Sequence, residues 1–140
     1  MKKILIVNAN YYRDISLNLV RGAKKILNGF KVSLINVPGV FEIPISIKKN
    51  IKEYDGFVAL GCVIKGKTPH FDLLCQTSFD AIMKISINSN KPVGNGIITA
   101  LNKSQAITRS SLKKGSLKTN KGSEAAKAVV SVLENDPKKI

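Results

Sequence analysis

Apolar and polar residues follow one another along the chain in a pattern that predicts strands and helices in turn. The run Ile4 to Val7 is wholly apolar, which is typical of a strand covered on both faces in a parallel sheet. Three later segments have strand character and are bounded by glycine, proline or asparagine. Strands are therefore expected at 2–8, 30–37, 56–63 and 92–99.

Helical spacing of apolar residues fills the stretches between these strands. The clearest helix starts at Asp14, the expected cap, carries Ile15, Leu19 and Ala23 on one stripe, and stops at Asn28-Gly29. A second helix is entered through 40–44, with Pro44 in its first turn. A third is expected at 73–87.

The last part of the chain is more polar. Ser104 is expected to cap a short helix over 104–109, and 110–122 is expected to be an irregular, lysine-rich connection. A final helix should bury Ala125, Val129 and Val132. Strands alternating with helices imply right-handed crossovers and a parallel sheet. The expected fold is α/β: a single domain over 1–140, built as a three-layer αβα sandwich with a flavodoxin-like, four-stranded parallel sheet and helices on both faces.

Composition adds a strong positive charge to this picture. The 140 residues carry a formal net charge of +14 and are 44% hydrophobic, enough for a real core. The charge permits attraction to nucleic acid, anionic lipid or phosphorylated small molecules, and a solvated basic surface is the plain alternative. No apolar run is long enough to cross a membrane and no signal-peptide pattern is present, so a cytoplasmic protein is expected.

The two cysteines give no sign of a metal or disulfide framework. Cys62 and Cys75 lie in apolar surroundings without CxxC spacing, and the chain has one histidine. Both are expected to be buried thiols, with no metal site.

The candidate chemistry lies where the strands end. Carboxyl ends of parallel strands share one edge of the sheet, where ligands bind in open α/β folds. The loops expected there carry Tyr11, 40–42, the segment GCVIKGKTPHFD at 61–72, and Asn95. His70 is the single histidine, a residue type suited to proton exchange at physiological pH, and Lys67 and Thr68 beside it can donate hydrogen bonds to an anion. A histidine of this kind is also often only a loop or core residue.

Five blocks at these positions resemble the lumazine synthase family, whose members make 6,7-dimethyl-8-ribityllumazine. The match is collinear over nearly the whole chain, in blocks that read VPGVFEIP (37–44), LGCVIKGKTPHFD (60–72), PVGNGIIT (92–99), QAITR (105–109) and NKGSEAA (120–126). The resemblance implies condensation of 5-amino-6-(D-ribitylamino)uracil with 3,4-dihydroxy-2-butanone 4-phosphate, with release of phosphate and water. It implies no metal and no cofactor, only positioning and proton transfer.

The resemblance also implies roles for individual residues. His70 matches the family's proton-transfer histidine. The positions that match contacts to the ribitylaminouracil are Tyr11, Val40, Phe41, Glu42, Cys62, Val63, Ile64 and Asn95. The positions that match contacts to the butanone phosphate are Lys67, Thr68, Arg109 and Lys121. Simpler readings stay open for three of them: Tyr11 as packing, Glu42 as a helix-start carboxylate, and Arg109 as a surface residue.

Some features depart from the family pattern. Asn95 stands where many members have an aromatic residue, so a polar contact to the pyrimidine replaces stacking. The connection 110–119 is longer than in compact members, and the chain begins at the first strand, without the N-terminal extension of capsid-forming members. We therefore expect a homopentamer whose active sites lie at subunit interfaces, with Asn95 and Arg109 supplied by the neighbour.

Two rival functions remain for the sequence alone. The first is a nucleic-acid-binding module, favoured by the net charge and by KKGSLKTNKG at 113–122, although no helix-turn-helix, zinc or RNP motif appears and no aromatics interleave with the basic residues. The second is a flavodoxin-like flavin binder, favoured by the sheet topology and opposed by the lack of a Ser/Thr-rich phosphate loop after the first strand. The enzyme reading accounts for the most residues and predicts no nucleic-acid partner and no membrane partner.

Overall fold

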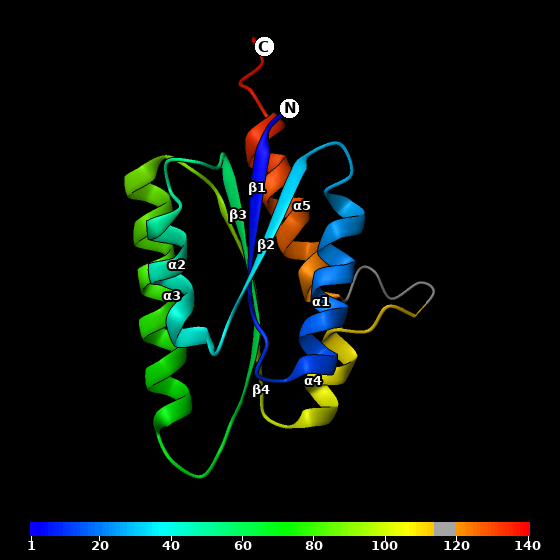
Figure 1. The fold of residues 1–140 in the computed structure, drawn as a ribbon, viewed down its shortest axis with the longest axis vertical. Coiled ribbons are helices and arrows are strands. Elements are labelled where there is room, and N and C mark those ends of the chain that lie inside the picture. Colours follow the sequence, from blue (N-terminus) through cyan, green and yellow to red (C-terminus); the bar gives the residue numbers. More distant parts are fainter. Residues whose placement is uncertain (114–119) are drawn as a thin grey trace.

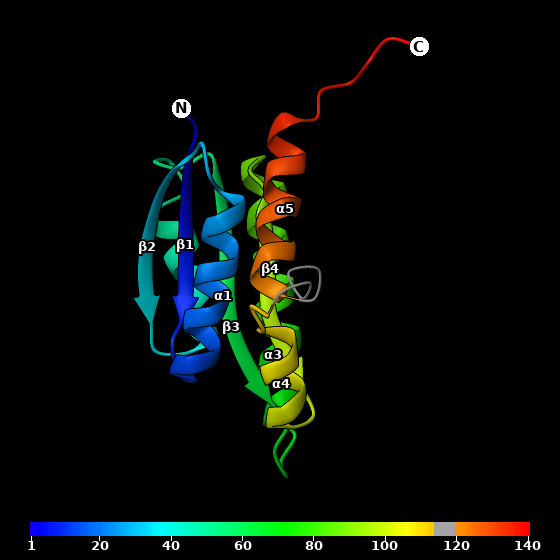
Figure 2. The same ribbon diagram turned by 90° about the vertical axis from the view of Figure 1, so that its right-hand side faces the viewer.

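A computed structural model describes residues 1–113 and 120–140. Four parallel strands form one sheet in the order β2-β1-β3-β4, and helices cover both of its faces (Figures 1 and 2). The strands are β1 (Lys3–Ala9), β2 (Lys31–Val37), β3 (Gly56–Ile64) and β4 (Val93–Ala100). The longer helices are α1 (Arg13–Ile26), α3 (His70–Ser89) and α5 (Lys121–Glu134), and the shorter ones are the 3-10 turn η1 (Val40–Glu42), α2 (Ile43–Lys49) and α4 (Lys103–Arg109).

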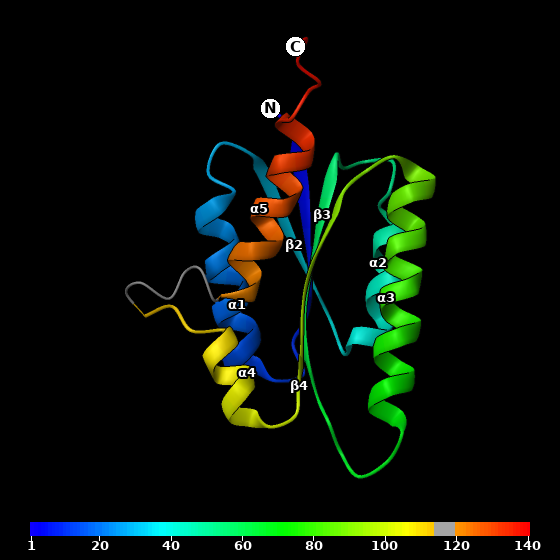
Figure 3. The same ribbon diagram turned by 180° about the vertical axis from the view of Figure 1, so that it is seen from behind.

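The two helical layers have different members. Helices α2 and α3 cover one face, while α1, α4 and α5 cover the other (Figures 1 and 3). This is the three-layer αβα sandwich that the sequence predicts, and the four-stranded parallel sheet is confirmed.

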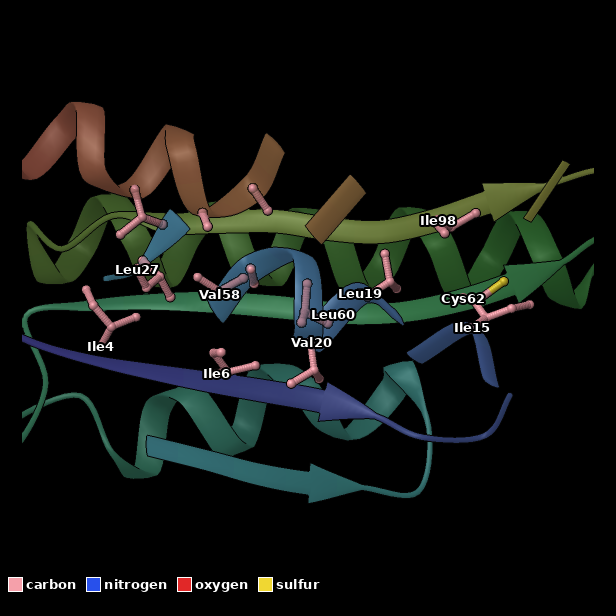
Figure 4. Close-up of a cluster of buried hydrophobic side chains, with 14 of the residues drawn as sticks. Ile4, Ile6, Ile15, Leu19, Val20, Leu27, Val58, Leu60, Cys62 and Ile98 are labelled. Atoms are coloured by element: carbon pink, nitrogen blue, oxygen red, sulfur yellow. The ribbon is translucent and has the colours of Figure 1, made fainter. Parts of the chain in front are cut away.

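The sheet is buried because its central strands are apolar on both faces. Every residue of β3 from Gly56 to Val63 is buried, as is β1 from Ile4 onward. On the α1 side, Ile6 and Leu60 point toward Leu19 and the rest of that cluster (Figure 4). A buried strand of this kind fixes the position of the loop that follows it, and so positions the site.

Several expected details of the helices differ in the structure. Asp14 does not cap α1, which begins at Arg13 with Tyr12 in the capping position and no side-chain cap; Asp14 lies in the first turn, where its charge still favours the helix dipole. Ser104 does not cap α4 either. The side chain of Asn102 does so, accepting a hydrogen bond from Gln105 N–H at 2.9 Å.

Helix α5 buries a different stripe from the one expected. Val132 is 64% exposed, and the inner face is made by Gly122, Ala125, Ala126 and Val129. These residues recur at i, i+3, i+4 and i+7, the spacing of a helix face that packs on a sheet. Only part of the expected connection 110–122 is irregular, because the helix already starts at Lys121; residues 114–119 lie outside the described residues.

Helix α3 begins one turn earlier than expected. His70 is its first residue rather than part of the preceding loop. The helix ends at Ser89, and the following residue, Asn90, caps its last turn with a left-handed φ of 59°. Of the two cysteines, Cys62 is buried, but Cys75 on α3 is only half-buried, which corrects the expectation for that thiol.

Candidate active site

A cavity of about 410 Å³ lies at the carboxyl ends of β1, β2 and β3. Its walls come from the turn after β1, from η1 and the glycine before it, from the end of β3 and from the start of α3, so residues far apart in sequence meet here. The residues that line it are Tyr11, Tyr12, Gly39, Val40, Phe41, Cys62, Val63, Ile64, His70 and Leu74. Seven of the residues expected from the sequence are therefore brought together: Tyr11, Val40, Phe41, Cys62, Val63, Ile64 and His70.

Each wall follows from the local fold. Tyr11 and Tyr12 lie in the short turn between β1 and α1, with their rings 5.0 Å apart and nearly perpendicular at 83°. Val40 is 4% exposed and anchors the turn after β2, whereas Phe41 beside it is 65% exposed. A buried anchor thus holds an accessible aromatic ring at the cavity edge.

His70 reaches the cavity from the first turn of α3. Its backbone N–H donates to Thr68 Oγ1 at 3.4 Å, which ties the helix start to the preceding loop. The loop from Lys65 to Pro69 extends beyond the sheet edge (Figure 1). The His70 imidazole is accessible and can exchange protons with a bound molecule.

The protonation of the cavity wall is set by burial. Burial raises the pKa of the Cys62 thiol to about 11, so this group is a neutral thiol at physiological pH. Burial also raises the pKa of Tyr12, with smaller contributions from Cys62 and Tyr11. Among the lining side chains, His70 carries the one imidazole, the side chain most often used for general acid–base catalysis. The cavity suits a planar, uncharged ring with a single acid–base group beside it.

Six expected site residues do not line this cavity. Lys67 and Thr68 lie in the adjoining loop, and Glu42 is half-buried at the end of η1. Asn95 lies inside β4, opposite Ala59 rather than in a strand-end loop, which corrects its expected place. Its side-chain oxygen accepts a hydrogen bond from Ile97 N–H at 3.0 Å. The remaining two are Arg109 and Lys121.

Arg109 and Lys121 belong to the opposite helical layer. Arg109 is the exposed last residue of α4, and Lys121 is the first residue of α5, with its Nζ 3.6 Å from Glu124 Oε2. Both cations are at the ends of the connection that contains 114–119. Asn120, before Lys121, donates to the carbonyl oxygen of Ser110, after Arg109, at 3.0 Å, so the backbone segments beside the two cations are in contact. Neither cation lines the His70 cavity.

The structure adds three lining residues that sequence reasoning missed. Tyr12 forms a doublet with Tyr11, and Gly39 precedes Val40, so both sit beside residues that were expected. Leu74 lies four residues after His70 on α3, which places the two side chains on the same helix face. That spacing is the signal that could have identified Leu74.

The described residues offer neither a metal cluster nor a membrane-spanning helix. Among residues 1–113 and 120–140, no group of three or more His, Cys, Asp or Glu side chains is placed to hold a metal ion. No helix in the described part of the chain has both the length and the apolar character needed to span a membrane.

Comparison with known proteins gives a consistent result. The family model described as 6,7-dimethyl-8-ribityllumazine synthase matches residues 1–136. A protein of that name from Bartonella bacilliformis is 40% identical over 136 residues, covering 93% of this chain and 87% of the relative. Those from Novosphingobium aromaticivorans and Limosilactobacillus reuteri are 41% and 39% identical, covering 95% and 94% of this chain. With the αβα fold and the strand-end cavity, these matches show that the chain belongs to the 6,7-dimethyl-8-ribityllumazine synthase family.

Proposed function

We propose that this chain condenses 5-amino-6-(D-ribitylamino)uracil with 3,4-dihydroxy-2-butanone 4-phosphate, using the His70 cavity as its active site. The products are 6,7-dimethyl-8-ribityllumazine, phosphate and water, and the reaction is a transferase step of riboflavin biosynthesis in the cytoplasm. The observation that carries the proposal is the meeting of Tyr11, Phe41, Cys62 and His70 around one cavity in a chain of this family.

The cavity wall suits the pyrimidine substrate. The rings of Tyr11 and Phe41 offer stacking surfaces, and the backbone of 62–64 offers hydrogen-bonding groups at the end of β3. Glu42 accepts hydrogen bonds from the ribityl hydroxyls, and Asn95 makes a polar contact to the ring. The neutral Cys62 thiol adds no charge beside an uncharged heterocycle.

The reaction needs positioning and proton transfer. The 5-amino group attacks the single carbonyl of the butanone, at C2, and water leaves to form an imine. Loss of the C3 proton and departure of the C4 phosphate with its bonding electron pair give an enol, which takes up a proton at C4 and becomes a ketone at C3. The ribitylamino nitrogen closes the second ring on this new carbonyl, and a second water leaves. His70 gives and accepts protons in these steps, while the walls hold the two substrates at reacting distance.

The phosphate end of the butanone requires positive charge, which the cavity wall itself lacks. Lys67 and Thr68, in the loop before α3, supply one cation and one hydroxyl donor close to His70. Arg109 supplies a planar guanidinium that binds two phosphate oxygens at once, and Lys121 adds a second cation.

We propose that the working form is a homopentamer with active sites at subunit interfaces. Asn95 and Arg109 do not line the cavity of their own chain, and we propose that a neighbour supplies both. Large apolar side chains are also exposed on the α2 and α3 layer, namely Phe41 (65%), Ile45 (58%), Leu73 (66%), Met83 (61%) and Ile87 (68%). Exposed apolar surface of this kind marks association sites. Light scattering should give five subunits; a particle of about sixty would contradict the proposal.

The direct test is an absorbance assay with both substrates, in which lumazine formation and phosphate release are followed together. Equal amounts of the two products are expected. Arg109→Ala should raise the KM for the butanone phosphate while leaving that for the aminouracil near its original value. Lys138→Ala, a charge-matched change in the exposed C-terminal segment, serves as the control. A folded wild-type protein that forms no lumazine would refute the proposal.

A further inference from the structure

Asn120 is a fully buried polar residue whose side-chain oxygen and nitrogen both form hydrogen bonds. Its Oδ1 accepts a hydrogen bond from Ser123 N–H at 3.0 Å, which caps α5. Its Nδ2 donates to Ser110 O at 3.0 Å, to Ser111 O at 3.3 Å and to Asn18 O at 3.3 Å. One amide therefore connects α5, the end of α4 and the middle of α1.

The positions of these contacts matter because of what lies beside them. Ser110 directly follows Arg109, and Lys121 directly follows Asn120. Ser110 is itself 1% exposed, and its Oγ donates to Ala106 O at 3.0 Å, so the backbone after Arg109 is held on both sides. The Asn120 side chain thus joins the backbone just after Arg109 to the backbone just before Lys121.

The packing around Asn120 leaves room for this amide. A Cβ atom on Gly22 of α1 would lie 2.2 Å from Asn120 Oδ1, and one on Gly122 would lie 2.1 Å from Leu19 O. Both distances are far too short for real atoms, so only glycine fits at either place. The two glycines let α1 and α5 approach closely and enclose the amide between them.

We propose that Asn120 is a positioning residue that fixes Arg109 and Lys121 relative to each other, so that both bind the phosphate of the butanone substrate. The inference rests on the proposed function of this site. Binding orders the two long side chains at a cost in conformational entropy, and a backbone that is not already fixed adds the cost of ordering that backbone too. A fixed separation of the two backbone points therefore favours binding of one phosphate by both cations. A shift of about 1 Å at a binding group can cost up to about 10²-fold in rate.

The test uses Asn120→Ala and Asn120→Ser in the full-length protein. Serine keeps a side-chain oxygen that can cap α5 but is too short to replace the Nδ2 donor, so it protects folding while removing the connection. Both variants should raise the KM for the butanone phosphate by about tenfold, and leave the KM for the aminouracil within about twofold. Inorganic phosphate, tested as an inhibitor, should bind both variants more weakly, with its inhibition constant raised by a similar factor.

Two further variants separate the possible outcomes. Val129→Ala shortens a buried side chain on the same helix without touching the Asn120 contacts, so it should lower stability and leave the ratio of the two KM values unchanged. If Val129→Ala changes the ratio of the two KM values as much as the Asn120 variants do, Asn120 acts only through stability. If Arg109→Ala raises the phosphate KM and both Asn120 variants do not, the positioning role is wrong. If Arg109→Ala itself has no effect, the proposed phosphate contact is wrong instead.

Discussion

The Cys62 thiol offers a sharp test of the electrostatics of the cavity wall. Cys62 is 7% exposed and lines the cavity, and burial raises its pKa from an ordinary 9.0 to about 11. The thiolate is the form that reacts with alkylating agents. At pH 8 a group with this raised pKa is about one part in a thousand thiolate, compared with about one part in ten for an ordinary thiol. Alkylation should therefore be about 100-fold slower than for a free cysteine.

The assay uses the Cys75→Ser variant, which leaves Cys62 as the single thiol. Its rate of reaction with iodoacetamide is measured between about pH 7 and pH 9.5, inside the range in which only the thiolate fraction should change. The logarithm of the rate should rise with pH throughout and reach no plateau. The same variant unfolded in urea should level off near the ordinary pKa.

A plateau near pH 9 in the folded protein would refute this reasoning. Restricted access to the cavity also slows alkylation, but it does so by the same factor at every pH. The position of the plateau, rather than the absolute rate, is therefore the decisive quantity.

Four other outcomes are expected. Gly122→Ala should destabilise the fold by roughly 2–3 kcal/mol in urea unfolding because its Cβ would meet Leu19 O at 2.1 Å, whereas Gly66→Ala, with no atom within 4 Å of the added carbon, should change little. Phe57→Ala should cost about 3–5 kcal/mol, since that ring is fully buried. His70→Ala should lower turnover by on the order of 10²-fold without abolishing it, and full activity would contradict the proton-transfer role. Retention on heparin resin should disappear at modest salt, because a positive charge spread over the surface binds a polyanion only weakly. Binding that resists salt would contradict this distribution of the charge.

The convergence of the cavity residues could be predicted from the sequence. Once the apolar runs indicate parallel strands, their carboxyl ends must share one edge, and the loops bearing Tyr11, Val40 and His70 must meet there. The structure places all three around one cavity. No long-range detail is needed for this step, because strand direction alone decides it.

The wrong predictions concern helix caps and one helix face, where the same local sequence is compatible with several structures. Asp14 and Ser104 are good capping residues, but each helix begins one residue or more before the expected position, so the backbone rather than the side chain type decides the boundary. On α5 the buried face also contains Gly122 and Ser123, which give no hydrophobic signal. The spacing of Ala125, Val129 and Val132 therefore predicts a stripe that continues to Val132, although that side chain is exposed.

The positions of Arg109 and Lys121 could not be derived from periodicity. The backbone beside them is joined by Asn120, whose side chain donates to Ser110 O and also to Asn18 O, 102 residues away in the sequence. A polar side chain that bonds backbone atoms at such separation leaves no pattern in either segment. Only the fold itself brings these groups together.

The pairing of α1 with α5 has a consequence for synthesis of the protein. Helix α1 is the first helix of the described residues to leave the ribosome, and α5, which packs against it, follows about a hundred residues later. Until α5 emerges, Leu19, Ala23 and the rest of that apolar stripe lack their final cover. The nascent chain therefore exposes this apolar surface through most of translation, and chains with exposed apolar surface are prone to aggregation. Premature termination before Lys121 would leave that surface permanently uncovered, making truncated chains candidates for chaperone capture and degradation.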